Sequence, residues 1–267
     1  MGERLVELKN ITKSFGNVRA LDQVSMYVDA GEIVGLIGDN GAGKSTLIKI
    51  LGGVFRPDSG EIYIKGQKVN GWSVAKAQEA GIETVHQDRA LVVQQSIAEN
   101  IFMGREISHR LGLIDVRQQH EEAGRLMRDI GFTSKVFDPG SVIATLSTFV
   151  VFVGGVVAAS ARALDFDADR LILDEPTTAL SLTESYKVFG FMRTAKERGS
   201  SVIFISHNIY HAYDVADRFV ILDRGRVVLE AEKSQIPSAD QLVADMQVIA
   251  RTGRHVPGET ASAPDAD

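Results

Sequence analysis

Residues 38–45 read Gly-Asp-Asn-Gly-Ala-Gly-Lys-Ser, which matches the phosphate-binding pattern G-x-x-x-x-G-K-S. The glycines let backbone N–H groups face phosphate oxygens, Lys44 can reach the β- and γ-phosphates, and the Ser45 hydroxyl can bind Mg²⁺. The predicted nucleotide-binding residues of this segment are Gly38, Asn40, Gly41, Gly43, Lys44, Ser45 and Thr46. We therefore expect ATP or GTP to bind here, the alternative being a glycine-rich turn with a chance Lys-Ser pair.

The segments on both sides of this loop predict the elements that position it. Residues 32–37 are mostly apolar and typical of a short buried strand, whereas residues 45–51 have the pattern of a helix. A phosphate loop at a strand-to-helix turn gains the partial positive charge of the helix N-terminus. This context favours a nucleotide site over a chance match.

Two adjacent carboxylates, Asp174 and Glu175, follow the apolar residues 171–173. A carboxylate at a strand end can hold Mg²⁺, and a second one that is free of the metal can act as a base toward water. We assign the metal to Asp174 and the water to Glu175. Alone, such a pair also occurs in turns and helix caps, but its combination with a phosphate loop favours the catalytic interpretation.

Three further side chains are candidates because of their positions. His207 follows the mostly apolar residues 201–206 at the carboxyl end of a predicted strand, where open α/β sheets bind ligands. Its imidazole can contact a γ-phosphate or the attacking water, or it can simply cap the next helix. Gln87 ends another short apolar segment, and its amide can touch metal, water or γ-phosphate. Phe15 can stack on an adenine ring, with ordinary core packing as an almost equal alternative.

The wider pattern predicts an α/β fold in three parts. Residues 5–27 and 60–69 alternate as in an antiparallel β subdomain, and residues from about 88 to 164, including a helix at 115–131, predict an inserted helical subdomain. From residue 170 onward, strands alternate with a helix near 182–198, and a hairpin turns at Arg224-Gly225. We expect one domain over residues 1–250 and a disordered tail over residues 251–267.

The phosphate loop, Gln87, the Asp174-Glu175 pair and His207 follow one another in an order that resembles the ATP-binding cassette (ABC) ATPases, over roughly residues 5–230. The resemblance implies a P-loop NTPase fold of the ABC type that uses ATP and Mg²⁺. It also implies the following site residues: Glu175, His207 and Gln87 for catalysis, and Ser45, Gln87 and Asp174 for the metal.

Residues 80–88 and 96–106 narrow the resemblance to bacterial monosaccharide-importer ATPases of the ribose, xylose and fructose type, in a single-cassette form. This implies an ATP-hydrolysing subunit that works as a homodimer of cassettes beneath two permease subunits, at the cytoplasmic face of the plasma membrane. An extracytoplasmic sugar-binding protein would be an indirect partner. The loop after Gln87 would lie near a groove that receives a permease helix.

The family's signature sequence, Leu-Ser-Gly-Gly-Gln or close to it, is not matched. Residues 145–164 read Thr-Leu-Ser-Thr-Phe-Val-Val-Phe-Val-Gly-Gly-Val-Val-Ala-Ala-Ser-Ala-Arg-Ala-Leu. After Leu146-Ser147, Thr148 and Phe149 stand where the family has glycines. The Leu146-Ser147 pair and the Ala-Arg-Ala-Leu sequence at residues 161–164 lie four residues farther apart than in the family. Phosphate contact needs close backbone approach, which Gly permits and Phe resists. The alternative function is therefore a nucleotide-binding cassette with impaired hydrolysis that acts as an interaction or regulatory module.

The composition indicates a globular protein with an acidic balance. The 267 residues are 44% hydrophobic and 24% charged, with a formal net charge of −6, which argues against broad nucleic-acid binding. The absence of cysteine excludes disulfides and thiolate metal sites and fits the cytoplasm. The apolar run 149–159 is too short to span a bilayer.

Overall fold

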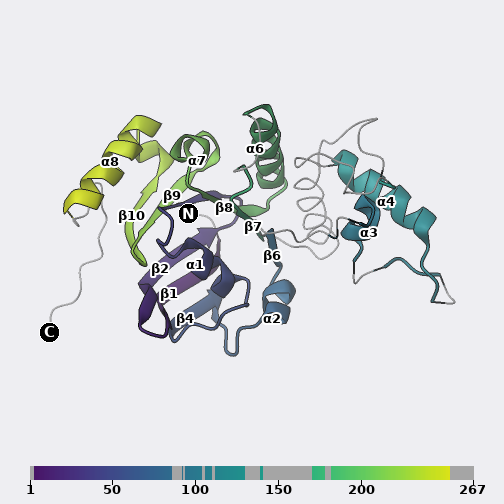
Figure 1. The fold of residues 1–267 in the computed structure, drawn as a ribbon, viewed down its shortest axis with the longest axis horizontal. Coiled ribbons are helices and arrows are strands. Elements are labelled where there is room, and N and C mark those ends of the chain that lie inside the picture. The colour runs from purple at the N-terminus through teal and green to yellow at the C-terminus, as the bar shows by residue number, and fades with distance from the viewer. Residues whose placement is uncertain are drawn as a thin grey trace.

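The computed structural model describes residues 3–85, 92, 94–103, 106–109, 112–129, 139–140, 170–177 and 182–252. Its strands form two sheets (Figure 1). The antiparallel sheet has the strand order β2 (Val18–Asp29), β1 (Arg4–Phe15), β4 (Ser59–Ile64) and β5 (Gln67–Lys68). The larger sheet has the order β10 (Arg226–Glu232), β9 (Arg218–Asp223), β3 (Ile33–Ile37), β8 (Ser201–Ser206), β7 (Arg170–Asp174) and β6 (Ile82–Val85). The α/β class and the antiparallel β subdomain are therefore confirmed.

Figure 1 shows where the helices lie relative to the two sheets, with α2 next to β6. Helix α1 lies near the antiparallel sheet, α6, α7 and α8 lie along the other side of the larger sheet, and α3 and α4 stand apart from both sheets. The helices are α1 (Lys44–Leu51), α2 (Val74–Glu79), α3 (Ile97–Ile101), α4 (Val116–Asp129), α6 (Leu182–Glu197), α7 (Ile209–Val215) and α8 (Ala239–Thr252), with a 3₁₀ turn η2 (Lys233–Gln235).

Strand β3 shows how one short segment serves two cores. All five of its residues are buried. Ile33 and Ile37 belong to the cluster shared with α6, α7 and α8, whereas Val34 and Leu36 belong to the cluster shared with α1 and the antiparallel sheet. Because side chains alternate between the faces of a strand, a continuous apolar run is what a strand covered on both faces requires.

The parallel strands end together at one edge of the larger sheet. Ile37 of β3 pairs with Ser206 of β8, and Asp174 of β7 pairs with Ile205. The phosphate loop, Glu175 and His207 follow these three strands directly. The register therefore brings the predicted site residues to one edge from three distant parts of the chain.

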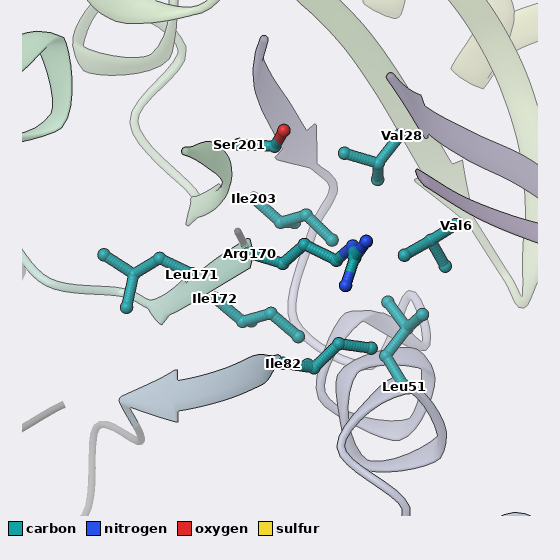
Figure 2. Close-up of a pocket in the computed structure, with 9 residues that line it drawn as sticks. All are labelled: Val6, Val28, Leu51, Ile82, Arg170, Leu171, Ile172, Ser201 and Ile203. Atoms are coloured by element: carbon teal, nitrogen blue, oxygen red, sulfur yellow. The ribbon is translucent and has the colours of Figure 1, made fainter. Parts of the chain in front are cut away.

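A buried arginine at the start of β7 contributes to the contact between the sheets. Arg170 is 5% exposed, and its Nη1 donates a hydrogen bond to the carbonyl of Ala80. In Figure 2 its guanidinium lies among apolar side chains that include Val6 of β1 and Leu51 of α1. The cavity between them measures only about 10 Å³, which is room for about one water molecule. The two sheets are thus closely packed at this point.

Arg218 of β9 connects the two sheets through hydrogen bonds, ion pairs and a contact with an aromatic ring. It is 1% exposed, and its Nη2 donates to Glu32 Oε1 at 2.6 Å and to the Tyr27 carbonyl at 2.7 Å. Its Nη1 pairs with Glu230, and its guanidinium carbon lies 3.9 Å from the centre of the Tyr27 ring. One buried cation therefore ties β2, the start of β3, β9 and β10 together.

The chain end differs from the expectation. Helix α8 runs from Ala239 to Thr252 and buries Leu242 and Ile249, so the first two residues of the predicted disordered tail are helical. Residues 253–267 lie outside the described residues, as does most of the predicted helical subdomain beyond α4. Among the described residues, no helix combines the length and the hydrophobicity that a bilayer crossing requires.

Candidate nucleotide-binding site

The phosphate loop follows β3 and ends in the first turn of α1. Gly43 is the N-cap of α1 with φ 105°, and Gly41 has φ 84°. A Cβ atom on Gly43 would lie 2.7 Å from the carbonyl oxygen of Ala20, and one on Gly38 would lie 2.4 Å from that of Leu222. The loop is therefore packed so closely against β2 and β9 that only glycine fits at these positions.

Lys44 is held inside the loop. Its side chain is 5% exposed, and its Nζ donates to the carbonyls of Gly38 at 2.6 Å and Asp39 at 3.0 Å. Burial lowers the pKa of Lys44, while the nearby carboxylates of Glu175 and Asp174 oppose this shift. The ammonium group thus lies between the loop and the acidic pair, where a terminal phosphate would place its charge.

The hairpin of β9 and β10 supports the loop from one side. Gly225 donates its N–H to the Ala42 carbonyl at 2.9 Å and accepts a hydrogen bond from the Asp22 N–H at 2.7 Å. Arg224 and Gly225 have φ values of 46° and 78°, as a two-residue hairpin turn requires. The predicted turn is confirmed, and it links the phosphate loop to β2.

Glu175 and His207 face each other across the same edge. His207 Nδ1 lies 3.4 Å from Glu175 Oε2, and the glutamate side chain is 14% exposed against 52% for the histidine. Glu175 adopts φ 49°, which is uncommon for a residue with a side chain and is typical of functional sites. Glu175 lines the pocket together with His207.

The structure contradicts one alternative for His207. Asn208 is the N-cap of α7, and its side chain accepts hydrogen bonds from the N–H groups of Tyr210 and His211. His207 therefore precedes the cap and is not the capping residue. Its imidazole remains available to the pocket.

An open pocket of about 870 Å³ collects most of the predicted residues. Its described lining is Val18, Arg19, Ala20, Asp39, Asn40, Gly41, Gly43, Lys44, Ser45, Thr46, Glu175 and His207. Val18, Arg19 and Ala20 were missed by sequence reasoning, because no motif marks them. They reach the pocket through the close approach of Ala20 to Gly43, which only the folded chain shows.

Phe15 lies beside this pocket at the end of β1. It is 45% exposed and packs edge-on against Phe55 at 5.3 Å, and it pairs with Val18, which lines the pocket. This exposure contradicts the core-packing alternative, whereas stacking on an adenine ring stays a prediction. Gln87 and residues 145–164 lie outside the described residues.

Comparison with known proteins places these features in a family. Residues 21–178 match the family model described as ABC transporter. The chain is 41% identical over 233 residues to the xylose/arabinose import ATP-binding protein XylG of Sulfolobus acidocaldarius, with 86% of this chain and 89% of that protein covered. It is 36% identical over 260 residues to the ribose import ATP-binding protein RbsA of Caldanaerobacter subterraneus, with 97% of this chain but 51% of that protein covered.

Solved structures agree at the level of the fold. A dimeric ATP-binding cassette with bound ADP and phosphate has a TM-score of 0.70 and 26% identity, covering 86% of this chain and 99% of that one. A nucleotide-free cassette from an ABC transporter has a TM-score of 0.76 and 21% identity, covering 91% and 95% of the two chains. The chain therefore belongs to the ABC transporter family, as an ABC-type ATPase domain.

Proposed function

We propose that this chain binds and hydrolyses ATP to energise the import of a monosaccharide through membrane permease subunits. The observation that carries the hydrolytic part is the contact of Glu175 with His207, 3.4 Å apart, in the pocket that also holds Lys44. In this pocket, Glu175 would act as the base for water and His207 would lie beside the γ-phosphate. Lys44 would bind the phosphates. The sugar-import part is supported by relatives named for xylose/arabinose and ribose import.

The site also has donors suited to Mg²⁺. Ser45 is exposed at the start of α1, and Asp174 ends β7 beside Glu175. Hydroxyl and carboxylate oxygens are the ligands that Mg²⁺ prefers beside substrate phosphates. We assign Ser45, Asp174 and Gln87 to the metal, which would supply charge neutralisation of the phosphates when bound. Glu175 remains as the base, consistent with its contact to His207.

Nucleotide binding by this family is expected to pair two cassettes. The dimeric state of a similar cassette supports a homodimer here. We place the dimer at the cytoplasmic face of the plasma membrane beneath two permease subunits, with an extracytoplasmic sugar-binding protein as an indirect partner. The single cassette covers nearly all of XylG and about half of RbsA, so two copies would supply the paired sites.

The test measures ATP binding and steady-state hydrolysis by the purified chain. We expect Glu175→Gln to lower kcat by at least about 100-fold with ATP affinity retained, because it removes the base but not the phosphate contacts. Glu197→Gln, at an exposed position at the end of α6, is the matched control and should leave both values unchanged.

A second variant tests the departure at residues 145–164. In this variant, the sequence Leu-Ser-Gly-Gly-Gln replaces the five residues that follow Thr145. If the unaltered chain hydrolyses ATP and Glu175→Gln abolishes this hydrolysis, the proposal is supported. ATP binding without turnover, recovered when the signature is restored, would instead establish a cassette with impaired hydrolysis.

A further inference from the structure

The loop after Glu175 and the helix after His207 make a second contact behind the pocket. Thr177 Oγ1 and His211 Nδ1 lie 3.2 Å apart and share a hydrogen bond. Thr177 is 6% exposed, and the described pocket lining includes Glu175 and His207 but neither Thr177 nor His211. The two segments are thus joined twice, once by groups that line the pocket and once by a part-buried pair outside that lining.

Contacts with Thr177 and with Phe189 of α6 hold the His211 ring, and its backbone is held within α7. Its backbone N–H donates to Asn208 Oδ1 at 3.3 Å in the first turn of α7. Its ring packs edge-on against Phe189 of α6 at 5.5 Å, and Phe189 in turn packs against Phe204 of β8 at 6.1 Å. A ring held in this way offers its Nδ1 atom to Thr177 in one orientation.

The charge state of His211 suits this contact. Burial lowers the pKa of His211, with a further lowering from His207 and an opposing effect from Asp214. The imidazole is therefore uncharged at neutral pH. A neutral imidazole can donate or accept at Nδ1, so either tautomer forms the hydrogen bond with a hydroxyl group.

We propose that His211 is a positioning residue for ATP hydrolysis, which acts through Thr177 to hold the Glu175 carboxylate at its working distance from His207. The inference rests on the proposed hydrolytic function. Glu175 sits in a left-handed backbone conformation that persists only if its surroundings hold it, and Thr177 is the buried anchor two residues away. A small displacement of a reacting group can lower the reaction rate by a large factor. The contact of Thr177 with His211 can therefore affect the rate of ATP hydrolysis although neither residue lines the pocket.

The kinetic test removes the hydrogen bond from each side. Thr177→Val keeps the side-chain volume, and His211→Phe keeps an aromatic ring beside Phe189 but is larger; both lose the bonding atom. We expect each variant to lower kcat about tenfold, with KM for ATP within about twofold, because Lys44 and the phosphate loop are untouched. The double variant should be no slower than the slower single variant, since both remove the same contact.

Rescue separates positioning from loss of structure. Asn at position 211 can place an amide group where Nδ1 lies, whereas Gln places it where Nε2 lies. His211→Asn should therefore restore kcat to within about twofold of the parent chain, and His211→Gln should not. Tyr210→Phe is the matched control on α7, because it removes the hydrogen bond from Tyr210 to Asp240 without touching Thr177. It should leave kcat unchanged.

Amide hydrogen exchange tests the contact without requiring turnover. His211→Phe should speed exchange of the amides of Asp174, Glu175 and Thr177 about tenfold, and His211→Asn should not. Unaltered exchange there together with unaltered kcat in Thr177→Val and His211→Phe would overturn the inference. If the parent chain shows no hydrolysis, the proposed function is wrong, whatever the exchange data show. In that case the exchange data alone test the contact: unaltered exchange in His211→Phe overturns the inference, and faster exchange supports the contact.

Discussion

Gly43 and Gly41 differ in their surroundings although both have positive φ values. A Cβ on Gly43 would lie 2.7 Å from the Ala20 carbonyl, whereas one on Gly41 would meet nothing within 4 Å. The first position therefore combines backbone conformation with close packing, and the second involves conformation alone.

This difference predicts unequal effects of alanine. Gly41→Ala should lower the free energy of unfolding by about 1 kcal/mol, and Gly43→Ala by about 2 to 4 kcal/mol, because its methyl group must displace β2 from the loop. Urea unfolding without nucleotide measures both values. Equal losses would mean that the approach of Ala20 places no constraint on the loop.

His211 predicts a pH dependence of stability. Its folded-state pKa lies below the ordinary value of about 6.5, so the unfolded chain binds the proton more readily. The contribution of His211 to the free energy of unfolding is fully present above pH ~6.5. It is lost as the pH falls through that value toward the folded-state pKa. Between pH 7.5 and 5 the parent chain should therefore lose more unfolding free energy than His211→Asn. Parallel curves from chemical denaturation would contradict this.

Single residues were predictable where a short motif carries the chemistry. The phosphate loop, Glu175 and His207 were found from their order and their places after apolar strands, and the structure brings them into one pocket. Val18 and Arg19 were not found, because their role depends on how β2 folds over the loop. The same holds for the contact between Thr177 and His211, which no spacing in the sequence reveals.

Among the elements, the buried parallel strands were predicted best. Strands β3, β7 and β8 are short apolar runs covered on both faces, so their composition alone marks them. Helix α8 was missed, although Leu242, Met246 and Ile249 recur at helical spacing. Val243, Ala244 and Val248 lie between them and are also apolar, although Val248 is 48% exposed, so the sequence shows no clean apolar stripe.

Arg218 predicts how strongly the elements depend on one buried charge. Arg218→Met should lower the free energy of unfolding by about 3 to 5 kcal/mol, because it leaves Glu32 and Glu230 without their buried cation. Arg226→Met removes a pair with Asp22 in which the arginine side chain is 70% exposed, and should cost no more than about 1 kcal/mol. Denaturant unfolding of both variants provides the comparison. Similar losses of unfolding free energy in the two variants would show that the buried ion pairs of Arg218 stabilise the fold no more than an exposed pair does.

At the scale of the whole molecule, the fold brings distant segments to a single edge. The pocket draws on β2, the phosphate loop and the ends of β7 and β8, so nucleotide contacts parts of the chain that are far apart in sequence. A ligand that binds only such an assembled site stabilises the entire folded state. Nucleotide binding and global stability should therefore be linked.

ATP at about 100 times its Kd should add about 2.7 kcal/mol to the free energy of unfolding. For a domain of this size that corresponds to a rise in Tm of roughly 5 to 10 °C. Lys44→Ala should abolish the rise at the same ATP concentration, because it removes the cation that the loop carbonyls hold beside the acidic pair. Lys49→Ala is the matched control: Lys49 lies in the last turn of the same helix and packs over Phe55, so the rise should persist. Thermal unfolding with and without ATP measures all three chains, and an equal rise in Lys44→Ala would mean that ATP binds somewhere other than this loop.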